Sequence, residues 1–146
     1  MTACTFFGHK ECYGLDTVTL KKKIEELILQ GVCCFYVGHQ GDFDSLALSC
    51  LQALKKTYSH IQIFVVLAYL PTKQIEHDPC AEYSIFPEGI EMGPPKFAIE
   101  RRNRWMIDKS EYCLCYVNHT WGGAYKFAQR AKNKGRLIFN LGTAKL

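Results

Sequence analysis

The sequence lacks several features that would assign its class directly. No apolar run approaches the roughly 20 residues that cross a bilayer: the longest, Ile61–Leu70, is interrupted by Gln62 and followed by Pro71. The N-terminus shows no basic region followed by a long apolar stretch and a small-residue cleavage site, which is the pattern of a secretory signal. We therefore expect a cytoplasmic protein with no membrane partner.

The eight cysteines do not have the spacing of a metal site. Cys-x-x-Cys does not occur, and Cys113 and Cys115 have no second pair of ligands at zinc spacing. Several cysteines instead lie in apolar runs, where a reduced thiol behaves as a small hydrophobic side chain. We expect core thiols, no structural metal and no cofactor.

Strong charge of either sign is also lacking, since the formal net charge is only +4 over 146 residues. The basic residues are scattered except at Lys21–Lys23 and Arg101–Arg104. A basic stripe interleaved with aromatic residues, typical of single-strand binding, is not visible. The composition therefore argues against nucleic acid as a partner.

The 48% apolar content is sufficient for one well-buried core in a chain of this length, which is too short for two ordinary domains. We expect a single domain, 1–146. Apolar runs alternate with amphipathic segments along it. The expected strands are Ala3–Phe7, Val32–Val37, Ile61–Ala68, Tyr112–Val117 and Leu137–Leu141. The expected helices are Leu15–Gln30, one that begins at about Asp44, about Lys96–Lys109, and Gly123–Lys134.

This alternation predicts an α/β fold with right-handed crossovers. Continuous apolar strands are typical of a parallel sheet that is covered on both faces. We predict a mainly parallel five-stranded sheet in the order 3-2-1-4-5, with helices on both faces. The segment Tyr69–Pro95 holds all five prolines and predicts a lid or binding loop, with a short extended piece at Tyr83–Phe86.

The predicted strand order places a topological switch between the first and fourth strands. The loops after Phe7 and Val117 would then open into one crevice. The residues predicted to be neighbours there are Gly8, His9, His119 and Gly122. His9, His39 and His119 each follow a predicted strand. A histidine at such a position can bind phosphate or act as an acid or base. Alternatively, it can hydrogen-bond to loop carbonyls.

Two glycine-containing turns lie between a strand and a helix. Gly122 and Gly123 would let an anion approach the N–H groups at a helix start, although two glycines also form ordinary turns. In the other turn, Gly38 and Gly41 precede Asp44, which either caps the helix or accepts from a ribose hydroxyl. Neither turn is a P-loop or a complete dinucleotide fingerprint.

The predicted helix before the fourth strand carries Arg101, Arg102 and Arg104. Guanidinium groups match phosphate oxygens in a bidentate way, whereas a solvated charged face is the competing interpretation. We expect at least one of the three to bind phosphate. Trp121, with Tyr69 and Tyr83, is a candidate stacking surface for a base, and each aromatic ring could equally be a packing residue.

Four short segments resemble, in chain order, the landmarks of the YpsA-like branch of the SLOG superfamily. They are Cys4–Lys10, Gly41–Asp44, Arg101–Met106 and Trp121–Ala124. The superfamily groups Rossmann-like proteins related to DprA and to the cytokinin-activating LOG enzymes. The resemblance covers about residues 3 to 141 and implies a Rossmann-like three-layer sandwich that binds nucleotides or their derivatives.

The resemblance also bears on catalysis. The LOG enzymes are phosphoribohydrolases that use an Arg and a Glu, and Arg102 matches the Arg. Gln129 occupies the position of the Glu, and an amide cannot exchange a proton as a carboxyl group does. Trp121 replaces a proline next to the diglycine, and Lys10 replaces an Arg of the YpsA-like group while keeping the charge.

We therefore expect non-catalytic binding of a nucleotide-derived small molecule, such as an ADP-ribose-like or cyclic nucleotide signal. The role would be sensing or sequestration, the latter as by a phage sponge that acts against a defence signal. The alternative is a LOG-like nucleoside 5′-monophosphate phosphoribohydrolase in which Glu100 or Asp42 supplies the carboxyl group. A homodimer or higher homo-oligomer is expected. The candidate ligand- and phosphate-binding residues, with no catalytic residue assigned, are Gly8, His9, Lys10, Gly38, Gly41, Asp44, Arg101, Arg102, His119, Trp121, Gly122 and Gly123.

Overall fold

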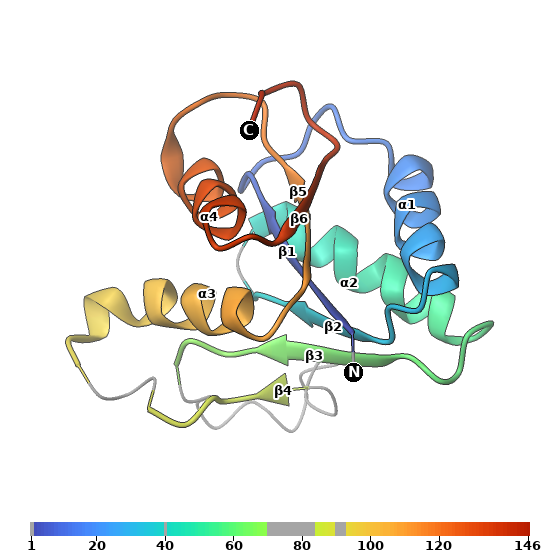
Figure 1. Cartoon of the computed structure of the whole chain (residues 1–146), viewed down its shortest axis with the longest axis horizontal. Helices are drawn as coiled ribbons and strands as arrows, with labels where there is room; N and C mark the ends of the chain where they lie inside the picture. Colours follow the sequence, from blue (N-terminus) through green and yellow to red (C-terminus); the bar gives the residue numbers. More distant parts are fainter. Residues whose placement is uncertain (1, 40, 70–83, 90–92) are drawn as a thin grey trace.

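Six parallel strands form one sheet in the order β4-β3-β2-β1-β5-β6 (Figure 1). The computed structural model describes residues 2–39, 41–69, 84–89 and 93–146. The strands are β1 (Ala3–Gly8), β2 (Cys34–Val37), β3 (Gln62–Val66), β4 (Ser84–Ile85), β5 (Tyr112–Tyr116) and β6 (Leu137–Asn140). The helices are α1 (Thr17–Leu29), α2 (Gly41–Lys55), α3 (Ala98–Asp108) and α4 (Gly122–Asn133), with a 3₁₀ turn at Pro95–Phe97 before α3.

The predicted fold class is confirmed, because β3-β2-β1-β5-β6 is the expected order of the five long strands. β4 adds a short sixth strand at the edge beside β3, within the extended piece predicted at Tyr83–Phe86. The first residue of that piece lies outside the described residues, as does most of the predicted lid between Tyr69 and Pro95. The helices in the described part of the chain are all too short or too polar to cross a bilayer.

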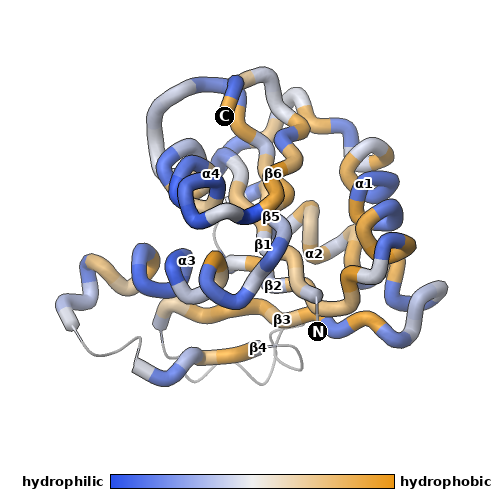
Figure 2. The backbone as a smooth tube through the Cα atoms, in the orientation of Figure 1, coloured by the Kyte–Doolittle hydropathy of each residue, from blue (hydrophilic) through white to orange (hydrophobic). Residues whose placement is uncertain are grey.

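Two apolar cores lie on opposite faces of the sheet. Side chains alternate along β1, so that Cys4 and Phe6 pack under α1 and α2, while Phe7 packs under α3 and α4. In β5, Leu114 packs in the first core and Cys115 in the second. Figure 2 shows the apolar strands between helices whose outer sides are hydrophilic. The continuous apolar runs in the sequence are thus strands covered on both faces, as predicted.

The cysteines in the described residues are free thiols, and all but Cys33 are buried. Cys4 and Cys113 are completely buried in β1 and β5. Burial, followed by the nearby carboxylates Asp42 and Asp44, raises the pKa of Cys12 to about 11. Cys12 therefore stays protonated at neutral pH, and the buried thiols pack as small apolar groups in the core.

α2 begins three residues earlier than predicted, and Asp44 is therefore not its N-cap. Gly41 has a φ of +86°, a conformation that favours glycine, and the N–H of Asp42 donates to the carbonyl of Lys10 at 2.8 Å. The loop after β1 thus supplies an acceptor for the start of the helix. As a result the Asp44 side chain lies in the first turn, beside the ends of β1 and β2.

Candidate functional site

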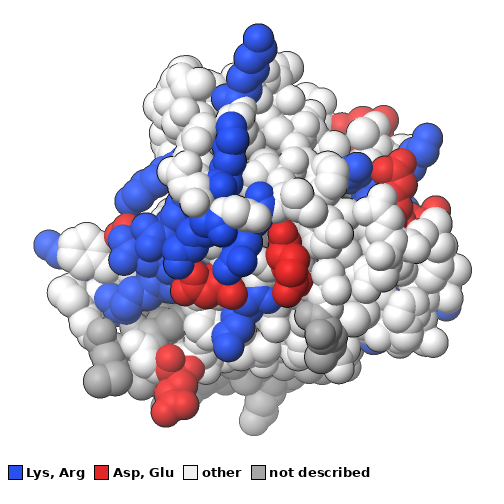
Figure 3. Space-filling model, viewed as in Figure 1, with Lys and Arg blue, Asp and Glu red and all other residues white. Residues whose placement is uncertain are grey.

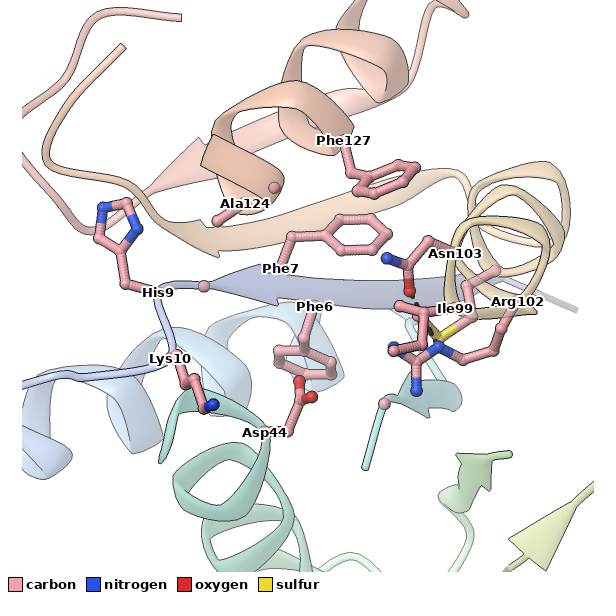
Figure 4. A pocket seen from close by; sticks show the side chains of 14 residues that line it. Phe6, Phe7, His9, Lys10, Asp44, Ile99, Arg102, Asn103, Ala124 and Phe127 are labelled. Carbon is pink, nitrogen blue, oxygen red and sulfur yellow. Dashed lines mark hydrogen bonds between the residues drawn. The ribbon is translucent and has the colours of Figure 1, made fainter. Parts of the chain in front are cut away.

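A crevice of about 320 Å³ lies at the carboxyl end of β1, between α2, α3 and α4. Open α/β folds bind ligands at this place, where the strand order reverses. Seven of the residues proposed from the sequence line the crevice: Gly8, His9, Lys10, Gly38, Asp44, Arg102 and Gly123. Figure 4 shows that Lys10, Asp44 and the Arg102 guanidinium lie on one side of β1, with Ala124 and Phe127 on the other.

The charged centre of the crevice is Arg102, a residue of α3 that is only 3% exposed. Its Nε donates to the side-chain oxygen of Asn103 at 2.9 Å, and its Nη1 donates to the carbonyl of Val66 at 3.4 Å. Desolvation lowers the pKa of Arg102 from its ordinary value, whereas the charge of Asp44 opposes this shift. Burying a guanidinium group is unfavourable unless partners compensate; here the Asn103 side chain, the Val66 carbonyl and the charge of Asp44 do so in part.

Gly38 allows Asp44 and Arg102 to approach each other at the end of β2. A Cβ atom at this position would lie 2.8 Å from a carboxylate oxygen of Asp44 and 3.1 Å from the central carbon of the Arg102 guanidinium. Any larger residue would therefore push these groups apart. The pair offers a cation for an anionic group and an acceptor for a hydroxyl group, in the same space.

The start of α4 forms the opposite wall of the crevice. Gly122 has a φ of +87°, and a Cβ atom at Gly123 would meet no described atom within 4 Å. The N-cap residue is Trp121, whose indole has no acceptor for the first N–H groups of the helix. α2 instead has Asp42 and Asp44 in its first turn. The start of α4 is therefore the more favourable helix terminus for an anion.

The glycines near β1 also have packing roles. A Cβ atom at Gly8 would lie 2.1 Å from the ring of Phe43, and one at Gly41 would lie 2.9 Å from the Cα of Lys10. These positions hold α2 close to the strand. Gly41 is not in the crevice lining formed by the described residues, and it acts on the site through the position of Lys10.

Three rings stack in a row that begins at His9; His9 lines the crevice, whereas His119 and Trp121 lie outside the described lining. The ring centroids of His9 and His119 are 4.0 Å apart, and those of His119 and Trp121 are 3.7 Å apart. Nε2 of His9 accepts from the Asn118 N–H at 2.8 Å, so His9 is neutral. Burial, then the neighbouring His119, lowers the pKa of His9 from its ordinary value. His119 Nδ1 lies 2.9 Å from the Trp121 carbonyl, to which it donates. The predicted neighbours are thus brought together, and Trp121 remains 68% exposed.

Arg101 lies apart from the site, although it was predicted to belong to it. Its Nη1 donates to the carbonyl of Pro94 at 3.0 Å, and it is not among the described residues that line the crevice. Asn103 was not predicted, yet it is 7% exposed and orients Arg102. The sequence did contain a signal for Asn103: it is a polar residue in the buried stripe of an amphipathic helix. Such a residue must be hydrogen-bonded, and Arg102 is its neighbour in the sequence.

The positions suggested for catalysis, Glu100, Asp42 and Gln129, are not among the described residues that line the crevice. Glu100 binds Arg104 at 2.8 Å and Lys126 at 3.2 Å, and its pKa is lowered first by the hydrogen bond from Lys126. Gln129 donates to the Tyr125 hydroxyl at 3.2 Å. Among the described residues that line the crevice, the acidic side chain is Asp44. The described residues also include no cluster of His, Cys, Asp or Glu that could hold a metal ion.

The architecture is that of a Rossmann-like α/β protein with a crevice at the topological switch point. The chain is similar over 99% of its length to DNA processing protein A (DprA) from Streptococcus pneumoniae, with a TM-score of 0.68, 18% identity and 52% of that chain covered. It is similar to DprA from Helicobacter pylori, for which a single-stranded DNA binding mode is described, with a TM-score of 0.68, 17% identity, and coverage of 99% of this chain and 66% of that one. This chain therefore spans between half and two thirds of these proteins. No protein-family model and no curated protein matches it.

The likeness to DprA contradicts the prediction against nucleic acid as a partner. That prediction relied on the net charge of the whole chain, which conceals an asymmetry. Residues 112–146 contain six Lys or Arg and no Asp or Glu. Figure 3 shows basic side chains gathered over α3 and α4. Acidic groups such as Glu100 and Asp108 interrupt this basic surface. The net charge of the whole chain did not reveal how the fold gathers the basic side chains.

Proposed function

We propose that the crevice binds a nucleotide-derived small molecule and releases it unchanged. The observation that carries this proposal is Arg102, a guanidinium group almost completely removed from solvent on the wall of a crevice at the switch point. In this proposal the protein senses or sequesters the ligand, as expected for a YpsA-like member of the SLOG superfamily.

The charges of the crevice favour one orientation of the ligand. Asp44 would repel a phosphate placed directly against it, whereas the N–H groups at the start of α4 and the ammonium group of Lys10 would attract one. We place the phosphate between Arg102, Lys10 and Gly123. The sugar hydroxyls then donate to Asp44, and the apolar wall formed by Met106 and Phe127 contacts the rest of the ligand.

The position of Gln129 supports binding without catalysis. Its amide bonds to Tyr125, outside the described crevice lining, and an amide does not transfer a proton in the way that catalysis by a carboxyl group requires. The phosphoribohydrolase alternative would depend on Asp44. It predicts release of a free base, which distinguishes it from simple binding.

A panel of ligands tests the proposal directly. The purified protein is incubated with nucleoside 5′-monophosphates, cyclic nucleotides and ADP-ribose, and free and heat-released compounds are quantified by mass spectrometry. We expect one or more compounds to be retained and to return intact on heating. Recovery as free base and ribose phosphate would instead support the hydrolase, and retention of none would contradict binding.

A second candidate function is binding of single-stranded nucleic acid. It is supported by the fold of the two DprA proteins and by the basic segment after residue 111. Lys126 is exposed on α4, and a lysine that contacts a phosphate contributes about one unit to the salt slope of binding. Lys126→Gln should therefore weaken binding of a labelled dT12 oligonucleotide and reduce that slope. Lys22→Gln on exposed α1 is the control, and equal effects of both would contradict this surface.

A further inference from the structure

A second recess lies next to the crevice, on the other side of the loop that follows β1. We call it the outer recess; its volume is about 450 Å³, and its walls include Glu11, Tyr13, Asn118 and His119. The crevice and the outer recess are each near the lower end of the 300–1,000 Å³ range typical of small-molecule sites. Each is therefore suited to one unit of a larger ligand.

A ridge formed by His9 and Lys10 separates the two spaces, since both residues line both of them. The ridge is fixed from both sides. The carbonyl of Lys10 accepts from the N–H of Asp42 at 2.8 Å, and the N–H of His9 donates to the carbonyl of Tyr116 at 3.3 Å. The imidazole of His9 accepts from the N–H of Asn118 at 2.8 Å. The spacing of the two recesses is thus set before a ligand binds, which favours affinity.

The chemical groups repeat on the two sides of this ridge. The crevice contains the carboxylate of Asp44 and the outer recess that of Glu11, and both can accept from sugar hydroxyls or base amino groups. The ridge provides the ammonium group of Lys10 between them. The outer recess adds the rings of His119 and Tyr13, the latter 90% exposed, and exposed aromatic rings stack on bases.

We propose that the crevice and the outer recess together bind one ligand made of two nucleoside or ribosyl units joined through phosphate. The linking phosphate lies between Arg102 and Lys10, one unit occupies the crevice, and the other occupies the outer recess against Tyr13. This inference rests on the proposed function, because it assigns the first unit to the same crevice. Such a ligand is either a free small molecule or two adjacent residues of a strand.

Calorimetric titration of the whole protein separates these possibilities. The ligands are adenosine 5′-monophosphate, the 5′-phosphorylated dinucleotide pApA and ADP-ribose. We expect pApA or ADP-ribose to bind at least about tenfold more tightly than the monophosphate. Tyr13→Ala should remove most of that advantage and leave the affinity for the monophosphate unchanged. Leu29→Ala, at a site that is 70% exposed on α1, is the control and should change neither.

Binding of the monophosphate with no gain for either two-unit ligand would overturn this inference and leave the proposed function intact. Equal weakening of all ligands by Tyr13→Ala would also overturn it. Binding of no ligand would overturn both. A labelled dT12 oligonucleotide shows whether the two units belong to a strand or to a free small molecule. If the protein binds dT12 more tightly than pApA, the ligand is two adjacent residues of a strand. If it binds dT12 more weakly, the ligand is a free small molecule.

Discussion

Arg102 and Gly38 show how one backbone position controls the chemistry of the crevice. The guanidinium group reaches the end of β2 only because residue 38 has no side chain, and Asp44 approaches the same point. Asn103 and the carbonyl of Val66 then fix the orientation of Arg102. The charged groups are thus positioned by buried contacts rather than by flexible surface side chains.

Substitution of Gly38 by alanine should disturb this arrangement. The added methyl group would lie within 3.1 Å of both Asp44 and Arg102. Because both contacts are with side-chain ends that can shift, we expect a cost of about 1 kcal/mol, at the lower end for overpacking. We expect Gly38→Ala to lower the free energy of unfolding and to weaken nucleotide binding, as measured by urea denaturation and calorimetry. Gly123→Ala is the matched control for stability, because a Cβ there meets no described atom within 4 Å. Equal loss of stability in both variants would contradict this explanation.

We expect His9 to make the stability of the protein depend on pH. Its pKa is lowered in the folded protein, so below about pH 6.5 the unfolded chain binds more protons than the native one. The free energy of unfolding therefore falls as the pH falls from about 6.5 through the pKa of folded His9. His9→Gln should reduce this dependence between pH 7.5 and 5.5, in urea denaturation, relative to the wild type. The exposed His60→Gln variant is the control, and an unchanged pH dependence in His9→Gln would contradict the assignment.

At the scale of elements, the start of α4 differs from the starts of the other helices. α1 is capped by Asp16, which accepts from the N–H of Val18 at 2.9 Å, and α2 has acidic residues in its first turn. α4 begins with two glycines and faces the crevice. A bound anion would complete the start of this helix in the same way as those side chains do elsewhere.

Gly123→Asp tests this interpretation by separating stability from binding. A carboxylate in the first turn of a helix stabilises it by about 0.3–1 kcal/mol, and replacement of a helical glycine adds up to about 1 kcal/mol. The same carboxylate would repel a phosphate. We expect higher stability together with weaker nucleotide binding.

Val18→Asp places the same charge at the equivalent position of α1, at a residue that is 71% exposed. It should leave binding unchanged, as measured by calorimetry. Retained affinity in Gly123→Asp would contradict the assignment of the phosphate to α4.

The sequence was sufficient to predict most elements and their order. Apolar runs such as Tyr112–Val117 and helical stripes such as that of α1 reflect burial, which depends strongly on local pattern. The start of α2 was wrong because the Lys10 carbonyl, far away in the chain, supplies its acceptor. The stack of His9 on His119 likewise depends on the pairing of β1 with β5, so the sequence indicated neighbours but no geometry.

For the whole molecule, the two cores and the crevice follow from one strand order. The gathering of basic side chains from α3 and α4 on one surface also depends on the fold. The net charge of +4 hid the basic surface over α3 and α4 (Figure 3). That surface lies beside the crevice in which we propose that a nucleotide binds. The predicted homo-oligomer and the assignment of the chain as a single domain stay predictions.

The central claim is that the crevice containing Arg102 binds a nucleotide phosphate. The most direct measurement is calorimetric titration of adenosine 5′-monophosphate and ADP-ribose into the wild type, Arg102→Lys and Arg101→Lys. Lysine keeps the charge and loses the guanidinium fork. We predict that Arg102→Lys weakens binding at least about tenfold, since charge-assisted hydrogen bonds contribute about 1.5–3 kcal/mol, whereas Arg101→Lys binds as the wild type does. Equal affinity of Arg102→Lys and the wild type, or no binding to any of the three proteins, would contradict the claim.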